Sequence, residues 1–87
     1  MKIEFKKDDK QDLITIKQNG NKVILKKRDF ERICNYANGT FSDTFNKTQW
    51  RVSHETIFKP NHHFIITMIA KDKKIVFKTN NIPKNIR

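Results

Sequence analysis

A β-hairpin is indicated by the stretch from Asp12 to Lys27, DLITIKQNGNKVILKK. The dipeptide Asn19-Gly20 stands between two runs rich in β-branched residues, and both of its residues tolerate the positive φ that a two-residue type I′ turn requires. A turn of this length fixes the register of the two strands. Counting outward from it, the predicted facing pairs are Gln18 and Asn21, Lys17 and Lys22, Ile16 and Val23, Thr15 and Ile24, Ile14 and Leu25, and Leu13 and Lys26.

This register divides the hairpin into an apolar face and a basic face. Lys17 lies directly beside Lys22 on the basic face, and Lys26 follows further along. Like charges that face each other across a strand pair are mildly destabilising. The lysines are therefore either an ordinary solvated face or a basic patch that binds a polyanion, and the pattern alone leaves both readings open. The predicted core face consists of Ile14, Ile16, Val23 and Leu25.

The net charge of the whole chain favours the second reading, a basic patch that binds a polyanion. Its 87 residues include 19 Lys+Arg against 9 Asp+Glu, a formal net charge of +10. Codon bias in an AT-rich genome would raise lysine, but it would raise glutamate as well, and the only glutamates are Glu4, Glu31 and Glu55. The surplus of bases therefore needs another explanation. Lysine supplies point charges for phosphate rather than the forked geometry of arginine, which favours binding to a nucleic-acid backbone over reading of bases.

Length and composition bound the class of protein. A chain of this size holds one hydrophobic core, so we predict a single domain over residues 1–87. No apolar run approaches the roughly 18 residues of a membrane-spanning helix, and the first residues lack a signal peptide, so we predict a cytoplasmic protein without membrane contact. The single cysteine, Cys34, excludes an internal disulfide framework and a cysteine-based zinc site.

Four further segments have the alternation or the apolar run of a strand. Residues 2–6 alternate strictly, and residues 49–59 place Trp50, Val52, His54, Thr56 and Phe58 on one face. Residues 62–70 are almost continuously apolar, which is typical of a central strand covered on both sides. Residues 75–79 form the last predicted strand, and 80–87 are predicted to be an extended basic tail.

One amphipathic helix is predicted between the hairpin and the later strands. It spans Asp29 to Gly39, with Asp29 as the N-cap and Asn38-Gly39 as the C-terminal stop. Its apolar face consists of Phe30, Ile33, Cys34 and Ala37, which makes Cys34 a core residue rather than a reactive thiol.

The stretch from Thr40 to Gln49 is the least determined part of the chain. The spacing of Phe41 and Phe45 suits a second short helix, and an irregular segment is the alternative. Both rings are predicted to fill the core rather than to stack on bases.

Together these elements predict an α+β fold in the order β-β-β-α-β-β-β. The expected architecture is a curved or half-closed antiparallel sheet with the short amphipathic helix packed on it. The apolar central strand must be covered on its second face by the curled sheet or by another copy of the chain, so homodimerisation is one of the two expectations.

No pattern of catalytic or metal-binding residues emerges. His62 and His63 are adjacent on a predicted strand and point to opposite faces, and His54 lies on the preceding strand, so none has the spacing of a zinc site. The only glycines, Gly20 and Gly39, are accounted for by the turn and the helix stop, so there is no glycine-rich phosphate loop. We therefore predict a protein that is not an enzyme and has no metal or cofactor.

The predicted function is binding of nucleic acid, either DNA or a single strand, through lysine rows on two hairpins. A second cluster around the last hairpin would join the first row, and Trp50 or Phe58 could stack bases at the edge, unless they belong to the core. The candidate residues are Lys17, Lys22, Lys26, Lys27, Arg28, Trp50, Arg51, Lys71, Lys73, Lys74 and Lys78.

The alternative is a protein-interaction module. A small protein of the kind found in phages and mobile elements could dock on an acidic surface of a host or replication protein. The basic charge suits both partners, nucleic acid and an acidic protein, so composition does not separate them.

Overall fold

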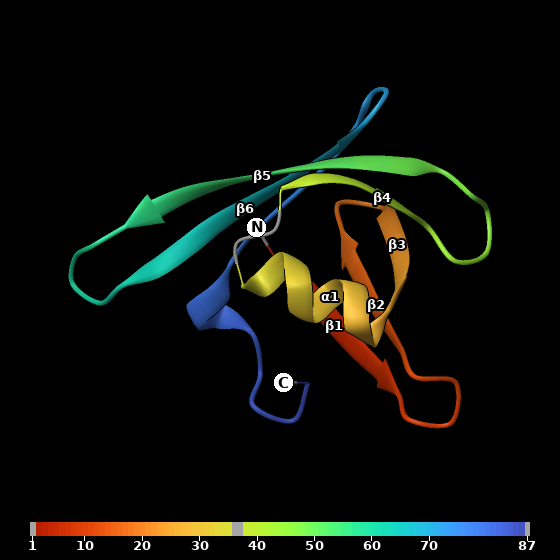
Figure 1. The fold of residues 1–87 in the computed structure, drawn as a ribbon, viewed down its shortest axis with the longest axis horizontal. Helices are drawn as coiled ribbons and strands as arrows, with labels where there is room; N and C mark the ends of the chain where they lie inside the picture. The colour runs from red at the N-terminus through yellow and green to blue at the C-terminus, as the bar shows by residue number, and fades with distance from the viewer. Residues whose placement is uncertain (1, 36–37, 87) are drawn as a thin grey trace.

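The computed structural model describes residues 2–35 and 38–86, and its elements follow the predicted order (Figure 1). A hydrophobic core joins all parts of the chain into one small α+β domain. The elements are β1 (Ile3–Asp8), β2 (Leu13–Gln18), β3 (Asn21–Lys26), α1 (Lys27–Cys34), β4 (Gly39–Ser42), β5 (Gln49–Ile57), β6 (His63–Ala70), β7 (Lys73–Lys78) and the 3₁₀ turn η1 (Thr79–Asn81).

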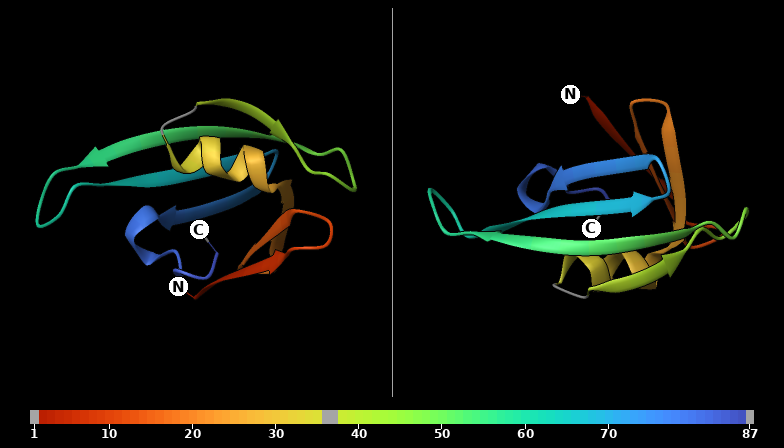
Figure 2. Two further views of the ribbon diagram at one scale, coloured as in Figure 1. Left: turned by 60° about the horizontal axis from the view of Figure 1, so that its bottom comes forward. Right: turned by 90° about the horizontal axis from the view of Figure 1, so that it is seen from above.

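The strands form two antiparallel sheets. The first is three-stranded, in the order β1-β2-β3, and the second is four-stranded, in the order β4-β5-β6-β7. Figure 2 shows the strands of the first sheet crossing those of the second at a steep angle. The predicted α+β class and the order of the elements are confirmed. The strands are divided between two sheets that pack together, where a curved or half-closed sheet was expected.

The register of the first hairpin is confirmed at every predicted pair from Gln18–Asn21 to Leu13–Lys26. Asn19 has a φ of 53° and Gly20 a φ of 79°, the positive values that a type I′ turn requires at both positions. The predicted core face is buried: Ile14, Ile16, Val23 and Leu25 are all 0% exposed. The hairpin therefore presents its other face to solvent, where the lysines lie.

Three phenylalanines hold the helix between the two sheets. The ring of Phe30 on α1 lies 6.1 Å from Phe5 of β1 and 6.4 Å from Phe77 of β7, measured between ring centroids. Phe5 and Phe77 are themselves 5.3 Å apart in an edge-to-face arrangement, which aromatic pairs favour. The helix and the first sheet thus cover the inner face of the four-stranded sheet, while its outer face has no cover within the described part of the chain.

A side-chain amide joins the two sheets at the edge of β7. Gln18 is only 9% exposed, and its amide nitrogen donates to the carbonyl of Val76 at 2.9 Å. The amide oxygen of Gln18 accepts from the backbone N–H of Val76 at 2.8 Å. The side chain therefore makes the two hydrogen bonds that a neighbouring strand would make with this residue. Asn21 adds a bond from its side-chain nitrogen to the carbonyl of Lys74, at 3.2 Å.

Replacing Gln18 with alanine is expected to lower the free energy of unfolding by about 2 kcal/mol, because two hydrogen bonds are lost and two part-buried backbone groups of Val76 lose their partner. Urea denaturation measures the effect. Gln49→Ala is the matched control, because Gln49 also lies on a strand but its side chain is exposed, and it should change the stability by no more than about 0.5 kcal/mol. Equal losses in the two variants would contradict the role assigned to the Gln18 amide.

A buried carboxylate attaches the β4–β5 turn to the edge strand β3. Asp43 is 2% exposed, and its Oδ2 accepts the backbone N–H of Ile24 at 2.9 Å. The backbone N–H of Thr44 donates to the carbonyl of Ile24 at 2.8 Å. The other carboxylate oxygen, Oδ1, accepts the N–H groups of Phe45 at 2.8 Å and Asn46 at 3.1 Å. Asp43 thus fixes its own turn and attaches that turn to β3.

The helix begins and ends earlier than predicted. It starts at Lys27 directly after β3, where the backbone N–H of Lys27 donates to the carbonyl of Asp12 at 2.9 Å, so Asp29 lies in the first turn and is not the N-cap. Asn35 caps the C-terminus. Gly39 opens β4 instead of ending the helix, and the predicted helical position of Ala37 lies outside the described residues. Within the described part of the chain, no helix is long and apolar enough to cross a membrane.

Two segments differ from their predictions. Residues 40–49 do not form a second helix. The stretch begins in β4, which pairs with β5, and the turn organised by Asp43 connects the two strands. Residues 80–86 do not extend as a tail. They fold back over the core through η1, and Ile82 is 7% and Ile86 is 2% exposed.

Candidate nucleic-acid interface

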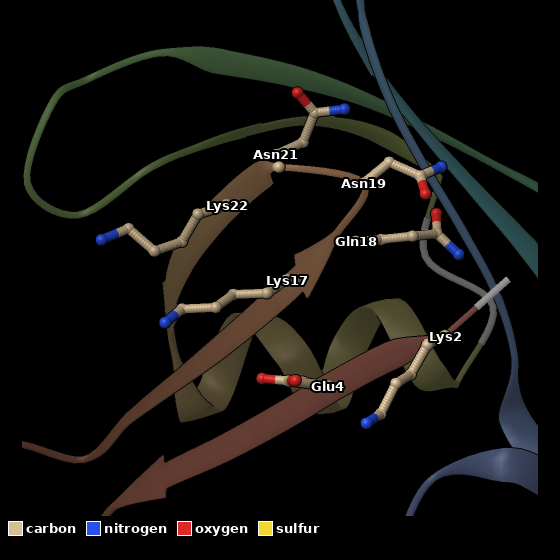
Figure 3. Close-up of a pocket in the computed structure, with 8 residues that line it drawn as sticks. Lys2, Glu4, Lys17, Gln18, Asn19, Asn21 and Lys22 are labelled. Atoms are coloured by element: carbon tan, nitrogen blue, oxygen red, sulfur yellow. The ribbon is translucent and has the colours of Figure 1, made fainter.

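The first group of predicted cations lies on the outer face of the three-stranded sheet. Lys17, Lys22 and Lys26, called here the hairpin row, are all exposed. Lys17 and Lys22 are direct cross-strand partners, and Figure 3 shows their side chains extending side by side in the same direction. Glu4 of β1 is the partner of Lys17 on its other side. Lys2, Glu4, Lys17 and Lys22 line one hollow of about 430 Å³.

The second group lies on the outer face of the four-stranded sheet. Ile75 and Phe77 of β7 are buried, so Lys74 and Lys78 point to the opposite, solvent-exposed side. The pairing Arg51–Ile69–Lys74 runs across β5, β6 and β7 and places Arg51 in the same row as Lys74. Arg51, Lys71, Lys74 and Lys78 are called here the outer strip.

Lys71 and Lys73 lie where β6 turns into β7. Lys71 shares a hollow of about 390 Å³ with Arg51, which places it beside the outer strip's row on β5. Lys73 is the first residue of β7, and its side chain is exposed to solvent. The structure therefore brings Arg51 together with Lys71, Lys74 and Lys78 on one sheet, whereas Lys73 alternates to the side of Ile75 and Phe77 at the end of β7.

The hairpin row and the outer strip adjoin at the turn of the first hairpin. Gln18 and Asn19 line the hollow that contains Lys17 and Lys22, and they also line a hollow of about 580 Å³ that contains Lys74 and Lys78. The side chain of Gln18 points away from the hairpin row, toward β7 (Figure 3). The two groups thus meet at the Gln18–Asn21 turn but face outward from two different sheets.

Lys27 and Arg28 occupy the first turn of α1 rather than a loop before it. Lys27 is half-buried, whereas Arg28 is exposed and lines a hollow together with Lys26. Arg28 consequently extends the hairpin row toward the turn that follows β4.

Few of the cations have an acidic partner. Within residues 2–35 and 38–86, ion pairs join Lys7 to Asp9 at 3.3 Å and Arg32 to Asp29 at 3.8 Å. Neither pair involves the hairpin row or the outer strip. The charges of both groups therefore remain available to an external anion. Even the two paired cations are held weakly, because exposed ion pairs stabilise proteins by only about 0–1 kcal/mol.

The aromatic residues divide between the core and the surface. Trp50 is 1% exposed and lies within the core, where its ring is out of reach of a bound base. Phe41 is 7% exposed and fills the core as predicted, but Phe45 is 63% exposed, so its predicted core role is wrong. Phe58 is 73% exposed and lies just beyond the end of β5.

Phe45 is an exposed ring that the sequence pattern assigned to the core, so it was not among the predicted site residues. It shares a hollow with Lys26 and Arg28, two of the predicted cations. The local sequence carried a signal, because Asp43 followed by Asn46 and Lys47 is typical of a turn that an aspartate side chain closes. In the structure, Lys47 adopts a φ of 62° in this turn. The four-residue spacing from Phe41 suggested a helix instead.

The histidines have structural partners. His54 is half-buried on β5, and its Nε2 contacts the carbonyl of Ile33 at the end of α1, at 2.5 Å. Its Nδ1 contacts the side-chain oxygen of Asn38, also at 2.5 Å. His63 is 7% exposed and contacts the carbonyl of Asn61. Among the described residues, no cluster of three histidine, cysteine or acidic side chains could hold a metal ion.

Comparison of the chain with protein-family models, with curated proteins and with solved structures found no match.

Proposed function

We propose that the protein binds nucleic acid, with phosphates held by the hairpin row and by the outer strip. The observation that carries this proposal is the juxtaposition of Lys17 and Lys22, which lie directly opposite each other, exposed, and outside the ion pairs of the described chain. Like charges that face each other across a strand pair are mildly destabilising. Glu4 faces Lys17 from β1, but Lys22 lies on β3, which pairs with β2 alone, so a bound polyanion would relieve the remaining repulsion. A row of lysines matches the spaced phosphates of a nucleic-acid backbone better than it matches a single small anion.

Binding of this kind depends strongly on salt. Each phosphate that a cation neutralises releases counterions, so the logarithm of the association constant falls linearly with the logarithm of the salt concentration. Lysine contacts to the backbone also confer little sequence preference, because phosphates carry no base information.

Reversing the charge of the hairpin row, in Lys17→Glu/Lys22→Glu/Lys26→Glu, is expected to weaken oligonucleotide binding at least tenfold. Loss of three phosphate contacts should reduce the slope of the salt dependence by about 2 for a single strand. The corresponding reversal of the outer strip's hairpin, Lys71→Glu/Lys73→Glu/Lys74→Glu, tests whether both groups contribute. Fluorescence anisotropy across a salt series provides the measurement.

The control must change the net charge equally. Lys10→Glu/Lys59→Glu/Lys84→Glu replaces three exposed lysines from separate turns, so it has the same charge as each of the other two variants. It should retain most of the wild-type affinity if the site is local. If all three variants weaken binding to the same degree, the interaction follows net charge alone, and the assigned surface is wrong.

A second function is favoured by one observation on the outer face of the four-stranded sheet. Ile69 is 45% exposed there, in the same row as Arg51 and Lys74. An aliphatic side chain flanked by cations suits an acidic protein surface that carries apolar residues. A second copy of the chain fits less well, because it would bring Arg51 and Lys74 close to cations of their own kind.

The two functions differ in their response to nuclease and to a substitution. A protein complex persists after nuclease treatment and is disrupted by Ile69→Asp, whereas nucleic-acid binding follows the lysines. Analytical ultracentrifugation of the purified protein shows whether the partner is another copy.

A further inference from the structure

An aromatic ring is held out into solvent next to two cations. Phe45 is 63% exposed, although a ring of this size normally contributes to a core in so small a domain. Its backbone is tightly fixed, since its N–H donates to Oδ1 of Asp43 and the preceding residue, Thr44, pairs with Ile24 of β3. Phe45 is therefore a preorganised surface feature, and a ligand that uses it does not need to order the turn first.

The ring borders a hollow of about 450 Å³, which lies within the usual range for ligand pockets on proteins, about 300–1,000 Å³. Leu13, which is 8% exposed, contributes an apolar surface to it. Lys26 and Arg28 line the same hollow, and the carboxylate-bearing residue of the lining is Asp12. An apolar platform and an excess of positive charge thus meet in one place.

We infer that an unpaired base of a single-stranded nucleic acid stacks on Phe45 while its phosphate is held by Lys26 and Arg28. This inference rests on the proposed function and names its ligand more closely. Aromatic side chains bind the flat face of any base, and proteins that bind single strands combine such rings with cations along the backbone. In a duplex each base face is covered by its neighbours, so only a single strand can offer a face to Phe45.

Phe58 provides a matched comparison within the same chain. It is 73% exposed, but it follows the far end of β5, whose nine residues span roughly 26 Å at about 3.3 Å per residue. Figure 1 shows the β4–β5 turn and the β5–β6 turn at opposite ends of that strand. The ring neighbouring Phe58 is His62, at 5.7 Å, and Phe58 does not line the hollow of Lys26 and Arg28.

The experiment compares Phe45→Ala with Phe58→Ala in binding to an oligothymidylate and to a duplex of equal length. Phe45→Ala is expected to weaken binding of the single strand about tenfold, because base–aromatic stacking contributes on that order. The slope of the salt dependence should stay unchanged, because the phosphate contacts remain. Duplex binding should be the same for both variants and the wild type.

A spectroscopic readout separates stacking from a merely structural role. Phe45→Trp retains an aromatic surface, and its indole should be quenched when a single strand binds, against the constant signal of the buried Trp50. An oligonucleotide that carries 2-aminopurine should likewise change its fluorescence with the wild type and with Phe58→Ala, but not with Phe45→Ala. Circular dichroism and thermal unfolding confirm that each variant is folded.

The outcomes distinguish this inference from the proposed function. If Phe45→Ala and Phe58→Ala bind the single strand as the wild type does, or lose affinity equally, the stacking site is refuted while salt-dependent binding still supports the proposed function. Duplex binding that weakens as much as single-strand binding in Phe45→Ala refutes it too. If the wild type binds no oligonucleotide at all, both proposals fall, and an exposed ring that binds a protein becomes the remaining explanation.

Discussion

Replacing Phe41 with alanine is expected to lower the free energy of unfolding by about 3–5 kcal/mol, the range for removal of a buried phenylalanine ring from a core. Phe41 is 7% exposed, pairs with Trp50 across β4 and β5, and lies beneath the guanidinium of Arg32, whose central carbon is 5.5 Å from the ring centroid. For a domain of this size such a loss is a large part of the total stability, which is typically about 5–15 kcal/mol. Urea denaturation followed by circular dichroism measures it.

Phe45→Ala is the natural control for this prediction, since the two rings are four residues apart in the sequence. Removal of an exposed side chain should change the stability by no more than about 0.5 kcal/mol. The conservative variant Phe41→Leu retains much of the apolar volume and should lose less than Phe41→Ala. Similar losses at positions 41 and 45 would contradict the burial of Phe41 and the exposure of Phe45.

Replacing Asp43 with alanine is expected to lower the free energy of unfolding by about 3 kcal/mol. Its carboxylate accepts three backbone N–H groups, from Ile24, Phe45 and Asn46, and hydrogen bonds to a charged group contribute about 1.5–3 kcal/mol each where they are buried. The two bonds within the turn contribute less than this, because water replaces them when the turn opens. The N–H of Ile24 is part-buried and would be left without its acceptor.

Two further variants sharpen the prediction for Asp43. Asp43→Asn retains one oxygen acceptor and should lose less stability than Asp43→Ala. Asp72→Ala removes an exposed carboxylate in another turn and should be close to neutral. Amide hydrogen exchange at Ile24 adds a local readout, since protection there should fall in Asp43→Ala and stay unchanged in Asp72→Ala. Unchanged protection in both would show that Asp43 does not attach its turn to β3.

The first hairpin was predictable because its information is local. Asn19-Gly20 selects the turn, the turn selects the register, and alternation then assigns every side chain to a face. The exposed positions of Lys17, Lys22 and Lys26 follow from these steps without knowledge of the rest of the chain.

The turn at Asp43 has a local signature, but its attachment to β3 depends on a contact that no local pattern reveals. The carboxylate of Asp43 binds the N–H of Ile24, which lies 19 positions earlier in the chain. Without that contact, the spacing of Phe41 and Phe45 is compatible with one face of a helix. The position of Phe45 outside the core, next to Lys26 and Arg28, therefore became visible only in three dimensions.

The helix bounds failed for a similar reason. Asp29 is a favourable N-cap by its chemistry, but β3 runs directly into α1, where Lys27 bonds to the carbonyl of Asp12 at the start of β2. The pairing of the sheet thus decides where the helix begins, and the intrinsic preference of Asp29 is overridden.

The Gln18 amide has a consequence for the behaviour of the protein at high concentration. An exposed strand border can recruit the same segment of another molecule and propagate into fibrils. By occupying the N–H and the carbonyl of Val76, Gln18 denies an incoming chain its anchoring points on β7, and Asp43 and Thr44 do the same at Ile24 on β3. The remaining borders belong to β1, which carries Lys6 and Lys7, and to the short β4. These contacts are therefore expected to disfavour edge-to-edge association of the sheets, while the basic faces stay open to solvent.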